Sequence, residues 1–183
     1  MKKLSIWFTA ILVAVGLGLV VPGPASATTS YCGLAWGSLM KQDAAMSGAA
    51  VTNIRTGQHY CFDRLVVDLG SGPHPGYTVR YVPEVVQDGS GLPVPVRGNA
   101  RLQVTVNAPS YDRNGNSTYT PANRSELANV AGYQTFRQVA SAGSYEGYST
   151  FGLGVRARLP FRVFTLDGPG QGSRLVVDVA HFW

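Results

Sequence analysis

The sequence contains the same short, strand-like segment twice. Residues 64–69 are Arg-Leu-Val-Val-Asp-Leu and residues 174–179 are Arg-Leu-Val-Val-Asp-Val, so only the last position differs. The β-branched content and short length of each copy favour a β-strand over a helix. Because side chains alternate along a strand, each copy has an aliphatic face and a face with charged ends, and we expect the aliphatic face to be buried. The aliphatic faces are formed by Leu65, Val67 and Leu69, and by Leu175, Val177 and Val179.

The rest of the chain also has the pattern of short strands. Segments that alternate apolar and polar residues are separated by turns rich in glycine and proline, and residues 101–106 are the clearest example. With 22 glycines and 11 prolines, the chain has little room for long helices. We therefore predict an all-β fold, a sandwich or partly closed barrel of short strands with two related halves.

The repeated strands leave two pairings open. If they are antiparallel neighbours, a register that places Arg64 opposite Asp178 also places Asp68 opposite Arg174, so the charges match. If they lie in separate halves, Arg64 and Arg174 occupy equivalent places and are free to bind an anionic ligand. We favour separate halves.

The N-terminal residues have the pattern of a secretion signal. Lys2 and Lys3 precede an apolar run over residues 4–21, and Ala25-Ser26-Ala27 is a small-residue cleavage site. A transmembrane anchor is the alternative, since the run is at the lower length limit for crossing a bilayer. The cleavage site and the lack of a charged stop after the run favour removal of residues 1–27. The protein is then secreted or cell-wall associated, and meets the membrane only during export.

Cys32 and Cys61 are the only cysteines. An even count in an exported chain predicts one disulfide, which would close a loop of about 30 residues and contribute about 3 kcal/mol. We expect it to tie an irregular or partly helical N-terminal segment, residues 28–59, to a β domain over residues 60–183. A short helical turn near residues 34–40 is weakened by its glycines.

Charge and motifs exclude several functions. The formal net charge of +5 is spread along the chain rather than clustered, which argues against nucleic-acid binding. No spacing typical of a metal site, a cofactor site or a catalytic triad is present, so we expect a protein without cofactors that is not an enzyme. The alternative hypothesis is a small secreted hydrolase or small-ligand carrier that uses His74 or His181.

The remaining candidates for ligand contacts are aromatic and basic. Tyrosines beside arginine or glycine can form a shallow platform for a sugar or a peptide, although aromatic residues on strands more often pack in the core. The candidate binding residues are Arg64, Arg174, Tyr77, Tyr81, Tyr145 and Tyr148.

A set of short motifs covers most of the chain from Cys61 to His181. The motifs are residues 62–68, 76–82, 88–91, 146–147, 160–163 and 174–181. In this order they resemble the AMIN-like family of exported actinobacterial proteins, and the order makes the set more specific than any one motif.

The resemblance implies a function as well as a fold. The AMIN-like family is similar to the AMIN domains. These are β-sandwich modules that place cell-wall amidases and secretins at the wall by binding peptidoglycan. For this chain the resemblance implies a secreted, non-enzymatic β domain that binds the cell envelope, either cell-wall glycan or an envelope protein. No catalytic or ligand residues follow from the resemblance. The oligomeric state does not follow from the sequence.

Overall fold

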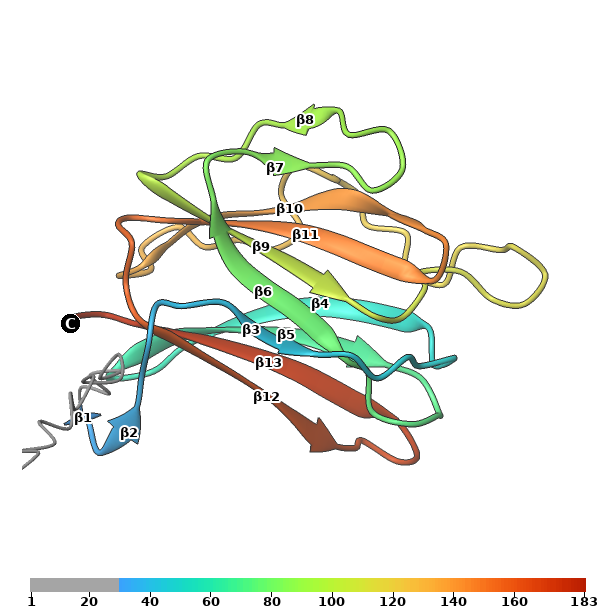
Figure 1. Ribbon diagram of the computed structural model, residues 1–183, viewed down its shortest axis with the longest axis horizontal. Helices are drawn as coiled ribbons and strands as arrows, with labels where there is room; N and C mark the ends of the chain where they lie inside the picture. Colours follow the sequence, from blue (N-terminus) through green and yellow to red (C-terminus); the bar gives the residue numbers. More distant parts are fainter. Residues whose placement is uncertain (1–29) are drawn as a thin grey trace, which may run out of the picture.

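The computed structural model describes residues 30–183, and this part of the chain forms thirteen β-strands and no helix. Two antiparallel sheets pack face to face, as Figure 1 shows, so the all-β sandwich prediction is confirmed. The predicted signal peptide and its cleavage site lie outside the described residues. Among residues 30–183, no helix is long and apolar enough to span a membrane.

The first sheet has four strands in the order β12-β13-β5-β4. All its neighbours are antiparallel. Its strands are β4 (Val51–Gln58), β5 (Phe62–Leu69), β12 (Phe161–Asp167) and β13 (Ser173–Ala180).

The second sheet has five strands in the order β10-β11-β9-β6-β3 and is also antiparallel throughout. Its strands are β3 (Lys41–Asp43), β6 (Tyr77–Val82), β9 (Ala100–Val106), β10 (Phe136–Tyr145) and β11 (Tyr148–Val155). Two small two-stranded sheets are formed by β1 (Ser30–Tyr31) with β2 (Leu34–Ala35), and by β7 (Val85–Val86) with β8 (Pro93–Val94).

The core lies between the two sheets and is lined as the alternation predicts. The aliphatic faces of both repeated strands are buried, together with the inner faces of β9 and β11. The opposite faces of the repeats are less exposed than expected, because Val66 and Val176 are buried too. Phe164 of β12 lies directly across the ladder from Val176, so the outer face carries its own apolar row.

The two copies of the repeat are neighbours in one sheet, and the prediction of separate halves is wrong. β5 (Phe62–Leu69) and β13 (Ser173–Ala180) pair in the register that places Arg64 opposite Asp178 and Asp68 opposite Arg174. A strand sequence defines the character of its two faces, but its partner is chosen by the rest of the fold. Here the complementary charges permit the antiparallel pair that forms.

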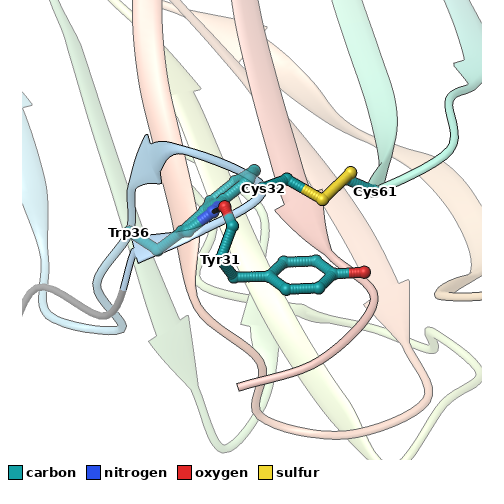
Figure 2. Close-up of a disulfide and its surroundings, with 4 residues drawn as sticks. All are labelled: Tyr31, Cys32, Trp36 and Cys61. Carbon is teal, nitrogen blue, oxygen red and sulfur yellow. Dashed lines mark hydrogen bonds between the residues drawn. A yellow bond between two sulfur atoms is a disulfide. The ribbon is translucent and has the colours of Figure 1, made fainter.

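The N-terminal segment is held to the end of the four-stranded sheet (Figure 2). The predicted disulfide joins Cys32 to Cys61, whose Cα atoms are 6.3 Å apart. Cys32 and Gly33 both have positive φ and form the two-residue turn between β1 and β2. Trp36 is buried against Phe62, and its Nε1 donates a hydrogen bond to the carbonyl oxygen of Tyr31. Strands and irregular backbone therefore replace the helical turn considered for residues 34–40.

The strands do not follow the predicted division at residue 60. β3 (Lys41–Asp43) completes the five-stranded sheet, and β4 (Val51–Gln58) pairs with β5 in the other sheet. Both therefore contribute to the sandwich, although they precede residue 60. Where the chain is best divided into domains stays a prediction.

Two connections cover parts of the sandwich. The β7–β8 hairpin lies on the outer face of β11, where a Cβ atom at Gly152 would come within 2.7 Å of Val96, so only glycine allows this approach. On one side, the β9–β10 segment (residues 107–135) runs along the edge strands β4 and β10. It bonds to β4 through Thr118 Oγ1, which donates to the carbonyl oxygen of Val51, and to β10 through the amide of Leu127. The hollows described below lie beside this segment.

Candidate functional site

The structure does not bring the six candidate binding residues together. Arg64 lies on the outer face of the four-stranded sheet, where its guanidinium forms two hydrogen bonds with Asp178, at 2.6 and 2.9 Å. Arg162 Nε donates to the same carboxylate at 2.8 Å, and Asp178 is completely buried. The guanidinium of Arg64 thus already has a partner carboxylate.

Arg174 lies near the other end of the same face. It donates to the backbone oxygen of Asp167, and its Nε is buried without a hydrogen-bond partner among the described residues. Its cross-strand neighbour Asp68 is bound instead by Arg55, through two hydrogen bonds of 2.7 and 2.8 Å. Of the two cross-strand charge pairs that the register allows, only Arg64–Asp178 forms a direct contact.

The four tyrosines fall into two places. Tyr77 and Tyr81 lie on the inner face of β6 and pack against the core. The Tyr81 hydroxyl donates to the carbonyl oxygen of Leu159 and accepts from its amide, and burial raises the pKa of Tyr81 to about 12. Tyr145 and Tyr148 are exposed and oppose each other at the β10–β11 turn. Tyr145 and Tyr148 are thus the more exposed pair, and a ligand role of any of the four tyrosines stays a prediction.

The two histidines of the alternative hypothesis lie in different environments, one buried and one exposed. His181 is buried, and its Nε2 lies 3.1 Å from Oδ1 of Asp63. Asp63 Oδ2 accepts hydrogen bonds from the amides of Thr135 and Phe136, so this carboxylate connects β5 and the C-terminal end of β13 to the start of β10. The pair is part of the interior of the sandwich.

His74 is exposed and lies against the edge strand β12. Its Nδ1 is 2.8 Å from Thr165 Oγ1 and its Nε2 is 2.6 Å from Asp167 Oδ1. The imidazole of His74 thus lies between a hydroxyl and a carboxylate. The side chain of Asp167 is almost fully exposed, and His74 does not line any of the hollows described below. The set fastens the β5–β6 loop to β12.

A polar groove of about 450 Å³ lies between the β9–β10 segment and the inner edge of β10 and β11. Its lining includes serine and threonine hydroxyl groups, two tyrosines and one arginine, together with the ring of Phe151 and other apolar atoms. The lining residues are Ser110, Tyr111, Gly115, Ser117, Tyr119, Thr120, Pro121, Arg124, Ser141, Gly143, Ser144 and Phe151.

One end of the groove is made rigid by a serine network. Ser110 Oγ is 2.8 Å from Ser149 Oγ, and the amide of Ser110 donates to Ser144 Oγ at 3.0 Å. Ser144 Oγ in turn donates to the carbonyl oxygen of Tyr148 at 2.7 Å. Tyr111 also joins the β10–β11 turn, because its hydroxyl accepts the amide of Gly147. The network fixes the segment against the turn, so this wall of the groove is preformed.

Other groups in the groove are free to bind a ligand. Within residues 30–183, the side chains of Arg124, Tyr119 and Thr120 form no hydrogen bond or ion pair with protein. Tyr119 is partly buried against the core, which raises the pKa of its hydroxyl and keeps it a neutral donor. An unpaired guanidinium beside hydroxyl groups can bind a carboxylate and hydrogen-bond a sugar.

A second polar hollow of about 490 Å³ lies on the other side of residues 119–121. It shares Tyr119, Thr120 and Pro121 with the groove and continues towards Thr52 and Asn53 of β4. In the described part of the chain, no three His, Cys, Asp or Glu side chains are grouped as a metal site would require. The arrangement suits non-covalent binding of a polar, extended molecule.

Residues 109–125 are rich in Ser, Asn, Thr and Pro, a composition typical of a polar surface loop. The sequence gives only a weak indication of a binding site here. Tyr111 and Tyr119 are the aromatic residues within this stretch of Ser, Thr and Asn. Nothing local shows that this stretch folds back along β4 and β10 to form a groove with Ser141 and Ser144.

The comparison with protein families matches the model of the AMIN-like domain over residues 49–181, most of the chain. This chain belongs to the AMIN-like domain family. Both sheets of the AMIN-like domain, except β3, and the whole groove lie within the matched residues. Comparisons with curated proteins and with solved structures found no significant match. The family indicates a domain associated with the cell wall.

Proposed function

We propose that this AMIN-like domain is an exported, non-catalytic module that binds peptidoglycan through the groove beside the β9–β10 segment. The observation that carries the proposal is the unpaired guanidinium of Arg124 in a groove lined by hydroxyl groups. Peptidoglycan offers both matching chemistries, since its sugars carry hydroxyl and amide groups and its stem peptides carry carboxylates. The family's association with the cell wall supports the same ligand.

The polymeric nature of peptidoglycan fits the two neighbouring hollows. A bound glycan strand or stem peptide can pass over Tyr119 and contact both of them, because they share residues 119–121. Stacking of a sugar ring on an exposed tyrosine adds apolar contact to such polar recognition. A ligand role of Tyr145 and Tyr148, which lie at the turn beside the serine network, stays a prediction.

Arg124→Ala is expected to weaken wall binding. Co-sedimentation of the protein starting at Thr28 with purified, protein-free cell wall measures the affinity, and titration with soluble muropeptides locates the recognised group. Loss of one charged hydrogen-bonding partner is worth about 1.5–3 kcal/mol, so the affinity should fall about tenfold or more. Arg80→Ala is the matched control, because Arg80 is an exposed arginine on β6 outside both hollows.

Three outcomes would contradict the proposal. Equal binding by the Arg124→Ala variant and the parent would remove the groove as the site. Binding only to wall that retains its proteins would favour an envelope protein as the partner. Release of soluble fragments by the parent but not by His74→Ala would replace the proposal with the hydrolase hypothesis, since His74, Thr165 and Asp167 place an imidazole, a hydroxyl and a carboxylate together at the surface.

A further inference from the structure

One end of the sandwich carries a patch of exposed and half-buried aromatic, aliphatic and basic side chains. We call it the aromatic-basic patch, and it consists of Tyr31, Leu39, Arg156, Arg158, Phe182 and Trp183. Leu39, Phe182 and Trp183 are 68%, 57% and 59% exposed. Large apolar side chains are normally exposed singly, so a group of them at one place indicates a binding surface.

Direct contacts show that the patch is continuous. The ring centroids of Tyr31 and Phe182 are 5.9 Å apart, edge to face, and the guanidinium of Arg156 lies over the Phe182 ring. Trp183 Nε1 donates a hydrogen bond to the carbonyl oxygen of Arg158. The guanidinium of Arg158 in turn donates to the carbonyl oxygen of Ser38, which precedes Leu39 in the chain. The N-terminal segment, the β11–β12 connection and the C-terminal residues therefore form one surface.

Three arginines lie at the end of the strands that carries the patch. Arg156 and Arg158 follow β11, and Arg101 is at the start of β9. Their positive charges would attract an anionic surface to this end of the domain.

The described chain also begins at this patch. Ser30 directly precedes Tyr31, and the preceding sequence contains the apolar run of residues 4–21. If that run is retained, it tethers the domain to the membrane at the patch. If the chain is cleaved after Ala27, the new N-terminus is Thr28, and its amino group adds one positive charge two residues before Ser30 in the sequence.

We propose that the aromatic-basic patch docks the domain on an anionic lipid surface. Aromatic side chains with an apolar body and a polar edge settle at the headgroup level of a bilayer, and nearby arginines attract anionic headgroups. Trp183 supplies the first property, Phe182 adds apolar contact area, and Arg156 and Arg158 supply the second. This contact goes beyond peptidoglycan binding and extends the membrane contact expected during export.

The groove and the patch lie at opposite ends of the strands. Ser149, in the serine network of the groove, is the second residue of strand β11, which ends at Val155, next to Arg156. The rise of a strand places these residues about 20 Å apart. The two surfaces can therefore be tested independently.

The test is vesicle binding by the protein starting at Thr28, which keeps every strand and the whole core described here. This protein contains two tryptophans, of which Trp36 is buried and Trp183 is exposed. Vesicles of equal parts phosphatidylglycerol and phosphatidylcholine should shift Trp183 emission to shorter wavelength, and brominated lipids should quench it. Vesicles of phosphatidylcholine alone should bind the protein at least tenfold more weakly. High salt should weaken binding to the vesicles that contain phosphatidylglycerol.

Two test variants and two control variants decide the interpretation. Phe182→Ala should weaken partition onto the anionic vesicles at least fivefold. Arg158→Gln should weaken it about fivefold, since each basic residue near an anionic leaflet contributes about 1 kcal/mol. Tyr145→Ala removes an exposed aromatic side chain at the opposite end and should leave partition unchanged, as should Arg124→Ala. Thermal unfolding of each variant shows whether the fold is intact.

The proposal is overturned if anionic vesicles leave Trp183 emission unchanged. It is also overturned if Phe182→Ala folds normally and binds vesicles like the parent, which would leave only general electrostatic attraction. Concentration-dependent self-association that is lost in Phe182→Ala, without vesicle binding by the parent, would assign the patch to a second copy of the chain instead. Each of these results leaves the peptidoglycan proposal untouched.

Discussion

At the residue scale, the outer face of the four-stranded sheet is organised around one carboxylate. Asp178 is fully buried and accepts hydrogen bonds from Arg64 and Arg162. Both guanidinium groups lie over the ring of Phe164, at 5.6 and 4.9 Å from its centroid. Arginine that is paired with a carboxylate and stacked on aromatic rings is held by several interactions at once. The strand repeat therefore places charged residues in a structural cluster.

Replacement of Asp178 by Asn tests this cluster. The change leaves two arginines without their counter-charge, and we expect the free energy of unfolding to fall by about 2–4 kcal/mol. This is somewhat below the loss of about 3–5 kcal/mol that is typical when a wholly buried pair is broken, because the two arginines are partly exposed. Urea unfolding measures the free energy difference. Asp167→Asn, at an exposed carboxylate, is the control and should change it by less than about 0.5 kcal/mol. Similar unfolding midpoints for both variants would show that the cluster contributes little.

Tyr81 gives a prediction about alkaline pH. Burial raises the pKa of Tyr81 from 10.0 to about 12, while its hydrogen bond to Leu159 and the nearby Arg158 act in the opposite direction. The raised pKa means that the unfolded state loses this proton first. The contribution of Tyr81 is therefore fully present below pH 10 and is lost progressively as the pH rises from 10 to 12.

Tyr81→Phe removes that titrating group. The variant is expected to be less stable at neutral pH, because the amide and carbonyl of Leu159 lose their partner, but to lose less stability than the parent between pH 10 and 12. Urea unfolding across this range provides the comparison. Parallel stability curves for parent and variant would refute the assignment of part of the alkaline loss to Tyr81.

At the element scale, strand existence was easier to predict than strand limits. Residues 101–106 alternate clearly, and β9 is Ala100–Val106. Strand β10 begins at Phe136, because residues 131–132 form a turn and the amides of Thr135 and Phe136 bond to the buried carboxylate of Asp63. Such a partner is distant in sequence, so local composition does not reveal it.

The N-terminal segment is the element that depends most on the disulfide. Cys61→Ser is expected to destabilise the protein by about 3 kcal/mol in the chain-entropy model and to increase amide exchange in residues 30–43 more than in β5 and β13. Cys32→Ser serves as the matched variant, and the double variant should lose no more than either single one. Additive losses would mean that the serine substitutions act through local packing and not through the shared bond.

At the scale of the whole molecule, the sandwich separates two surfaces. The β9–β10 segment forms the groove near the β10–β11 turn, while the N- and C-terminal residues form the aromatic-basic patch at the other end (Figure 1). A domain that rests on a membrane by the patch would direct the groove away from it, towards the wall. The proposed vesicle and wall experiments examine these two ends separately.

The sequence alone determined the class of fold, the buried faces of the repeats, the disulfide and the family. These are properties of local alternation, of a single cysteine pair and of ordered motifs, and none requires knowledge of distant contacts. Tertiary structure alone decided that β5 pairs with β13, that Arg64 meets Asp178 and that residues 109–125 form a groove with β10 and β11. Strand partners and hollows arise from packing between segments far apart in the chain, and many pairings satisfy the same local pattern.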